Sequence, residues 1–206
     1  MRCGLEGVRF AYEGKLVVDD FTLALPERGG VCLFGPSGCG KTTALRLLAG
    51  LERPDAGRVV GMEGKRVAMM FQEDRLLPWY TLRENLLLGM GKRADVEKNG
   101  EGDALAWLDA VGLAGEAGRR PGELSGGMRR RAALARALAR GGDVLMLDEP
   151  LKELDDANRQ RLVGLIREQA RGKLLVLVTH DREVAEALCD TVVLCQGPPL
   201  RRAEGA

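Results

Sequence analysis

The sequence has a single histidine, His180, and no cysteine pair in the C-x-x-C spacing that binds zinc or forms a redox couple. One histidine excludes most histidine-based metal sites. The cysteines fall mostly in apolar stretches, so we expect small buried side chains in a reducing compartment, in preference to a disulfide or zinc role. The five are Cys3, Cys32, Cys39, Cys189 and Cys195.

An excess of positive charge is also missing, because Lys and Arg total 31 against 30 Asp and Glu. A generic binder of nucleic acid or anionic membranes would carry a basic excess, so no nucleic-acid partner is expected. No apolar stretch approaches the about 20 residues that cross a bilayer. Residues 1–4 lack the apolar run of a signal peptide. We therefore expect a cytoplasmic protein.

What the sequence does contain is an alternation of strand and helix patterns. Apolar and polar residues alternate at 5–12 and 16–25, which predicts two antiparallel strands joined at residues 13–15. Further strands are predicted at 30–34, 67–71, 144–147, 173–178 and 191–194. Helices are predicted at 41–49, 81–90, 103–111, 126–139, 155–170 and 183–188. Residues 54–57 predict a turn, 91–100 a polar loop and 201–206 a frayed end.

This order of elements predicts the α/β class, with a mainly parallel sheet covered by helices. Residues 73–140 contain helical patterns and no convincing strand, which indicates an inserted α-helical lobe. We expect a single domain over 1–206, with a nucleotide-binding core formed by 1–72 and 141–206.

A glycine-rich loop lies between the strand at 30–34 and the helix that follows it. Its sequence is Gly35-Pro36-Ser37-Gly38-Cys39-Gly40-Lys41-Thr42, followed by Thr43. It fits the G-x-x-x-x-G-K-[ST] pattern in the strand-to-helix context that the pattern requires. Small residues let backbone N–H groups converge on phosphate oxygens at a helix N-terminus. We expect Lys41 to reach the β- and γ-phosphates and the Thr42 hydroxyl to bind Mg²⁺.

Two adjacent carboxylates, Asp148 and Glu149, follow the apolar strand at 144–147. Parallel sheets bind ligands at the carboxyl ends of their strands. Asp148 is therefore a candidate Mg²⁺ ligand through water, and Glu149 a candidate general base for an attacking water. An ordinary acidic turn is the alternative.

A second candidate phosphate-binding segment, Ser125-Gly126-Gly127, precedes a predicted helix. One bound nucleotide does not need two such loops from one chain, so each chain is expected to lend this segment to the other member of a pair. A serine N-cap on a helix near Gly126 is the plain structural alternative, and both can hold at once.

From Tyr12 to Val193 the chain resembles the ATP-binding subunit of an ABC transporter. The segments that carry this resemblance are the glycine-rich loop, Leu124-Ser125-Gly126-Gly127-Met128 and Leu147-Asp148-Glu149-Pro150. The resemblance implies a P-loop NTPase (RecA-like) core with N-terminal antiparallel β strands and an inserted α-helical lobe. It also implies ATP and Mg²⁺ as ligands, and hydrolysis of ATP coupled to transport.

Individual roles follow from the resemblance. Ser125 and Gly127 would contact the γ-phosphate held by a partner subunit. Tyr12 would stack on adenine, although a lone tyrosine ending a strand is often core. Gln72 would sense Mg²⁺ and the attacking water. His180 would be the switch histidine at the γ-phosphate, where the structural alternative is a strand-end residue.

Other positions belong to the dimer interface of the family or differ from the family's usual residues. Asp155 matches the acidic residue of the loop that crosses this interface. Met128 replaces the usual Gln, Arg130 lies where the family's helix commonly has Gln, and Lys152-Glu153 replaces a small pair. No catalytic position is lost.

The segment from Phe71 to Trp79, together with LSGGM, is similar to the nitrate, sulfonate and taurine importer branch. This similarity implies integral membrane permease subunits, a second ATP-binding subunit (a homodimer) and a solute-binding protein as partners. The chain would sit on the inner face of the cell membrane through the permease. Leu76, Leu77 and Trp79 would form a groove for a permease helix, or else belong to the core of the lobe.

Two other function classes remain open from the sequence. One is a soluble, non-transport ABC ATPase acting on nucleic acid or the ribosome. Such chains have a long coiled coil between the nucleotide motifs or two cassettes, and neither feature occurs here. The other is a nucleotide-binding regulatory module that never turns over.

Overall fold

The computed structural model describes residues 3–91 and 96–203, and the chain divides into two compact units. The first unit comprises Met1–Met69, Gly142–Glu149 and Ala170–Ala206. The second comprises Met70–Gly141 and Pro150–Gln169. The helical unit thus takes in residues 150–169, which the sequence analysis assigned to the core.

A small antiparallel sheet opens the first unit, with strand order β2-β1-β4. Strands β1 (Cys3–Tyr12) and β2 (Lys15–Leu25) confirm the predicted hairpin. Strand β4 (Ala56–Val60) was not predicted, and the turn expected over 54–57 is wrong in its second half. The residues of β4 are exposed or half-buried, and for this reason their sequence does not alternate between apolar and polar residues. Gly57 has φ +78°, and a Cβ there would lie 2.3 Å from the Gly7 oxygen.

The larger sheet has the strand order β5-β6-β7-β3-β8-β9. Its strands are β3 (Gly29–Phe34), β5 (Val67–Met70), β6 (Val144–Asp148), β7 (Leu174–Thr179), β8 (Thr191–Gln196) and β9 (Arg201–Arg202). Strand β3 runs parallel to β7 and β8, and β6 runs parallel to β7, as predicted. The frayed end expected over 201–206 is wrong for Arg201 and Arg202, which pair antiparallel with Gln196 and Cys195. Two exposed arginines show no strand pattern, so only tertiary pairing reveals β9.

The central strands of this sheet are apolar, and their carboxyl ends lie next to one another. All residues of β6 and β7 are buried. Phe34 pairs with Thr179, and Asp148 pairs with Val178. The carboxyl ends of β3, β6 and β7 therefore lie along one edge, where parallel sheets place their ligands.

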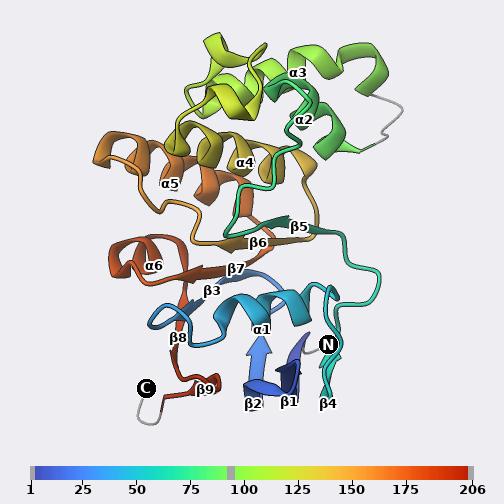
Figure 1. Ribbon diagram of the computed structural model, residues 1–206, viewed down its shortest axis with the longest axis vertical. Helices are drawn as coiled ribbons and strands as arrows, with labels where there is room; N and C mark the ends of the chain where they lie inside the picture. Colours follow the sequence, from blue (N-terminus) through green and yellow to red (C-terminus); the bar gives the residue numbers. More distant parts are fainter. Residues whose placement is uncertain (1–2, 92–95, 204–206) are drawn as a thin grey trace. The chain divides into compact units, whose positions relative to one another are not determined.

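Helix α1 (Lys41–Leu48) follows β3 and contacts the sheet through β6 and β7 (Figure 1). The leucines Leu45, Leu47 and Leu48 are buried. The helix ends where predicted, because Gly50 adopts φ +70° and donates its N–H to the Leu47 oxygen. Helix α6 (Arg182–Leu188) begins at Asp181, whose side chain accepts from the Val184 N–H.

All five cysteines are free thiols, and four of them are buried. Burial raises the pKa of the Cys195 thiol to about 12. The thiolate is the reactive form of cysteine, so this thiol is inert at neutral pH.

The second unit is helical, and in Figure 1 α2, α3 and α4 group together, in agreement with their mutual contacts. Its helices are α2 (Leu82–Met90), α3 (Val96–Ala110), α4 (Gly126–Arg140) and α5 (Asp156–Ala170), with 3-10 turns at Ala114–Glu116 and Pro121–Glu123. The polar loop predicted for 91–100 is wrong from Val96 onward, where α3 begins. Glu97 and Lys98 favour helix in spite of their polarity. Residues 92–95 of that prediction lie outside the described residues.

In the described part of the chain, no helix combines the length and the apolar composition needed to cross a bilayer.

Candidate functional site

The glycine-rich loop connects β3 to α1 with a backbone that only glycine adopts readily. Gly38 has φ +81° and Gly40 has φ +109°. Gly40 is the N-cap of α1 and has no side chain, so the first N–H groups of the helix donate to no capping side chain. A helix N-terminus of this kind binds phosphate.

Lys41 lies inside this loop and is only 5% exposed. Its Nζ donates to the main-chain oxygens of Gly35 and Pro36, both at 2.7 Å. The Cys39 sulfur lies 3.7 Å from the same nitrogen. The ammonium is therefore held at the centre of the loop, where a bound phosphate would lie.

Thr42, in the first turn of α1, and Asp148, the last residue of β6, come together. The Thr42 hydroxyl donates to Asp148 Oδ2 at 2.6 Å, and Asp148 is 1% exposed. A hydroxyl and a carboxylate oxygen are the ligands that Mg²⁺ takes beside substrate phosphates. These two residues therefore fit the metal that an ATP site requires.

Glu149 is held in a strained backbone conformation, with φ +49°. Its N–H donates to the Val178 oxygen at 2.8 Å. Its Oε1 lies 2.7 Å from His180 Nδ1, and the Thr179 hydroxyl donates to Oε2 at 3.3 Å. A left-handed non-glycine residue costs about 1–3 kcal/mol, and such strain concentrates at functional sites. Both carboxylate oxygens are thus fixed at the carboxyl edge of the sheet.

Tyr12 ends β1 at the surface, with 36% of the residue exposed. Its hydroxyl donates to Glu52 Oε1 at 3.1 Å and accepts from Arg46 Nη1 of α1 at 3.4 Å. Its ring meets Phe10 edge-on at 4.7 Å between centroids. The side chain is therefore not part of the buried core. A place in the core was the alternative that the sequence left open for Tyr12.

In the helical unit, Ser125 is the N-cap of α4 and its hydroxyl oxygen accepts from the Met128 N–H at 3.2 Å. Gly126 and Gly127 have no φ in the left-handed region, and a Cβ on either would meet its nearest atom at 3.9 or 3.7 Å. These are ordinary contacts. Within residues 3–91 and 96–203, nothing in the fold therefore requires glycine at these two positions.

The loop before α5 contains Lys152 and Glu153, whose side chains lie 3.7 Å apart. Asp155 follows and accepts from the main-chain N–H of Asn158 at 3.0 Å and from its side chain at 2.6 Å. These hydrogen bonds hold the pKa of Asp155 below its usual range. Asp155 thereby orders the start of α5.

The structure brings the predicted residues together in two groups. The core unit gathers Lys41, Thr42, Asp148, Glu149 and His180, with Tyr12 beside α1. The helical unit contains Gln72 and Ser125-Gly126-Gly127.

Thr179, whose hydroxyl donates a hydrogen bond to Glu149, was not predicted from the sequence. A polar residue ending an apolar strand directly before His180 was the available signal. Asp74 also had no predicted role, because no pattern in the sequence around it indicates one.

Comparison with known proteins identifies one family to which this chain is similar. A model of the family described as ABC transporter matches residues 18–152, more than half of the chain. The chain is 43% identical over 192 residues to the aliphatic sulfonates import ATP-binding protein SsuB 3 of Paraburkholderia xenovorans, covering 92% of this chain and 75% of that protein. It is 44% identical to SsuB of Burkholderia pseudomallei, covering 90% of this chain and 57% of that protein.

Solved structures agree with the family match. The ATP-binding cassette MJ0796 in a dimeric post-hydrolysis state, bound to ADP and phosphate, superposes with a TM-score of 0.84 at 26% identity over 93% of both chains. A second dimeric structure of MJ0796 gives a TM-score of 0.83 over the same share. With a glycine-rich loop, a carboxylate pair at a sheet edge and a glycine-rich helix start in this fold, the chain belongs to the ABC transporter family as an ATP-binding ATPase cassette.

Proposed function

We propose that this chain binds and hydrolyses ATP as the motor subunit of an importer whose membrane subunits are separate proteins. Two cassettes would close head to tail around two ATP molecules, since self-complementary twofold pairing is the usual geometry of homo-oligomers. The observation that supports the motor role best is the Glu149 carboxylate, fixed by His180 and Thr179 on the sheet edge that also carries Lys41. The names of the relatives support import, and do not favour a nucleic-acid or ribosome function.

ATP binding rests on the loop residues 35–43. Lys41 would exchange its two carbonyl partners for the β- and γ-phosphates, and the N–H groups of the loop and of α1 would surround them. Thr42 and Asp148 would hold Mg²⁺, which when bound neutralises charge on those phosphates. The resemblance to the family makes Gln72 a further candidate ligand of Mg²⁺. Tyr12 presents an exposed ring next to α1 for stacking on adenine.

Hydrolysis rests on Glu149 and His180. Glu149 would accept the proton of the attacking water, because a carboxylate held on both oxygens is aimed without further reorganisation. His180 uses Nδ1 for Glu149, so Nε2 is the nitrogen left for a γ-phosphate oxygen. The side chain of His180 is 51% exposed, which leaves it accessible to that ligand.

The shared site rests on Gly126 and Gly127. In the described part of the chain there is room for a side chain at both, so the two glycines leave space at the N-terminus of α4 for a ligand that approaches from outside. We infer that this is the γ-phosphate on a second copy, which Ser125 and the N-terminus of α4 would contact. Hydrolysis then removes the phosphate that favours the closed pair, and the pair opens.

Contact with a permease rests on an exposed apolar loop before α2. Trp79 is 79% exposed, Tyr80 43% and Leu77 39%, so these side chains are not the core of the helical unit. Buried Asn85 fixes their main chain, because its amide accepts from the Leu77 N–H at 2.7 Å and donates to three carbonyls of the loop. A rigid loop with exposed aromatic residues suits a permease helix.

With these partners, the chain would lie on the cytoplasmic face of the cell membrane, and a solute-binding protein would lie on the other side. The names of the relatives make aliphatic sulfonates the solute class that we propose. Co-purification of the permease and its solute-binding protein would identify the solute.

A complementation experiment tests the shared site. Chains with Lys41→Ala and chains with Ser125→Ala are tagged differently, mixed, and isolated as mixed dimers, all with Glu149→Gln so that bound ATP is retained. In a mixed dimer one composite site has both intact groups and the other has neither. We expect about one retained ATP per mixed dimer, against almost none for either variant alone. Mixed dimers that retain no more ATP than the separate variants would contradict a shared site.

A further inference from the structure

Arginines of α4 hold the segment 72–75 through its main chain. Arg130 donates from Nη1 to the Gln72 main-chain oxygen, and the same nitrogen lies 3.5 Å from Asp74 Oδ1. Arg136 donates to the main-chain oxygens of Arg75 at 2.8 Å and Asp74 at 3.2 Å. Three main-chain hydrogen bonds and one ion pair therefore tie this segment to one helix.

Arg129 extends the same cluster to the start of α4. Its Nε lies 3.6 Å from Asp74 Oδ2, and its Nη1 donates to the Leu124 oxygen at 2.7 Å. Leu124 directly precedes Ser125, the N-cap of the helix. Asp74 thus links Gln72 and the N-terminus of α4 through two guanidinium groups.

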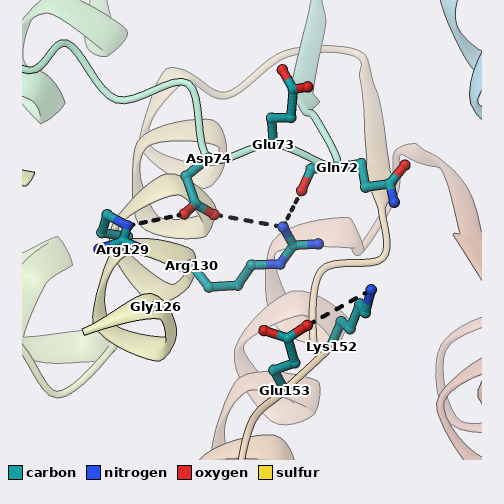
Figure 2. Close-up of a pocket in the computed structure, with 8 residues that line it drawn as sticks. All are labelled: Gln72, Glu73, Asp74, Gly126, Arg129, Arg130, Lys152 and Glu153. Carbon is teal, nitrogen blue, oxygen red and sulfur yellow. Dashed lines mark hydrogen bonds and ion pairs between the residues drawn. The ribbon is translucent and has the colours of Figure 1, made fainter. Parts of the chain in front are cut away.

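A cavity of about 380 Å³ is lined by Gln72, Asp74, Arg129 and Arg130, together with Glu73, Gly126, Lys152 and Glu153 (Figure 2). The Arg130 guanidinium points to the Gln72 main chain, while the Gln72 side chain extends away from it. The side-chain amide is therefore left open for another ligand, and its backbone is fixed.

Arginine has a specific advantage at position 130, where a glutamine amide would be shorter and uncharged. The residue is 9% exposed, and a buried cation is stable only when it is paired and hydrogen-bonded. A planar guanidinium can bond a carbonyl and a carboxylate at once. Breaking the pair would remove the hydrogen bond that holds the Gln72 main chain to α4.

We propose that Arg130 is a positioning residue that couples Gln72, the candidate Mg²⁺ ligand, to Ser125 and Gly127, which would contact the ATP held by a second copy. This inference rests on the proposed function. A change at Gln72 is transmitted through Arg130 and Asp74 to the N-terminus of α4. The two ATP sites of the dimer therefore respond to ATP cooperatively.

The experiment measures ATP turnover against ATP concentration for the whole chain. For the wild type we expect a Hill coefficient above 1, with a limit of about 2 for two sites. Arg130→Gln should bring it to about 1 and raise the half-maximal ATP concentration about 5- to 20-fold, the lower part of the range of a typical coupling between sites. Arg130→Lys keeps the cation beside Asp74 and is the variant least liable to misfold, and it should recover part of the cooperativity.

Arg161→Gln is the matched control, since Arg161 also donates to a main-chain carbonyl, that of Asp109 at 2.6 Å, away from Gln72. It should keep the Hill coefficient of the wild type. A wild type that hydrolyses ATP without cooperativity, or an Arg130→Gln chain that keeps it, would overturn the coupling role. A wild type that does not hydrolyse ATP would instead contradict the proposed function itself.

Discussion

Glu149→Gln is expected to lower steady-state ATP hydrolysis by about 10²- to 10⁴-fold, the usual contribution of a general base, with ATP affinity unchanged. The amide is nearly the same size as the carboxylate and keeps an oxygen for Thr179 or His180. It cannot accept the proton of the attacking water at neutral pH. Phosphate release by the purified chain measures the rate, and equilibrium dialysis with ATP measures the affinity.

Glu183→Gln is a suitable control, because this exposed residue in the first turn of α6 undergoes the same chemical change. It should hydrolyse ATP at the wild-type rate. If Glu149→Gln also hydrolysed ATP near that rate, Glu149 would not be the base.

Lys41→Ala should lower ATP affinity on the order of 10²-fold or more, because hydrogen bonds to charged groups contribute about 1.5–3 kcal/mol each and Lys41 would make two. The ammonium is already positioned inside the loop by Gly35 and Pro36. Titration with a fluorescent ATP analogue measures the affinity. Turnover should fall with it, since too little ATP is bound.

Lys173→Ala provides the control for this change, because Lys173 precedes β7 and lies at the opposite edge of the sheet. Its affinity for ATP should equal that of the wild type. Removing Lys41 also leaves two loop carbonyls without their donor, so thermal unfolding of the variant shows that it is folded. A folded Lys41→Ala chain with wild-type affinity would contradict the phosphate role of the loop.

The core site could be predicted from the sequence because its parts are local. The glycine-rich loop is contiguous, and Asp148, Glu149 and His180 each end an apolar strand. Parallel strands bring such ends to one edge. The strained φ of Glu149 could not be predicted, since an acidic residue after a strand is equally typical of a turn.

The parts that could not be predicted depend on contacts between distant residues. Strand β4 is recognisable only by its pairing with β1, and β9 only by its pairing with β8. Arg130 was visible as a departure from the family pattern. Its partner Asp74 is 56 positions away (130 minus 74), and no periodicity connects the two.

The proposed function requires that ATP joins two copies of this chain, and the mass of the Glu149→Gln chain in solution reports this joining. Sedimentation without nucleotide should give the monomer mass of 22.3 kDa, and addition of ATP with Mg²⁺ should give about twice that value. Adding Lys41→Ala or Ser125→Ala to the same chain should abolish the increase. A mass that stays at the monomer value with saturating ATP bound would contradict the account.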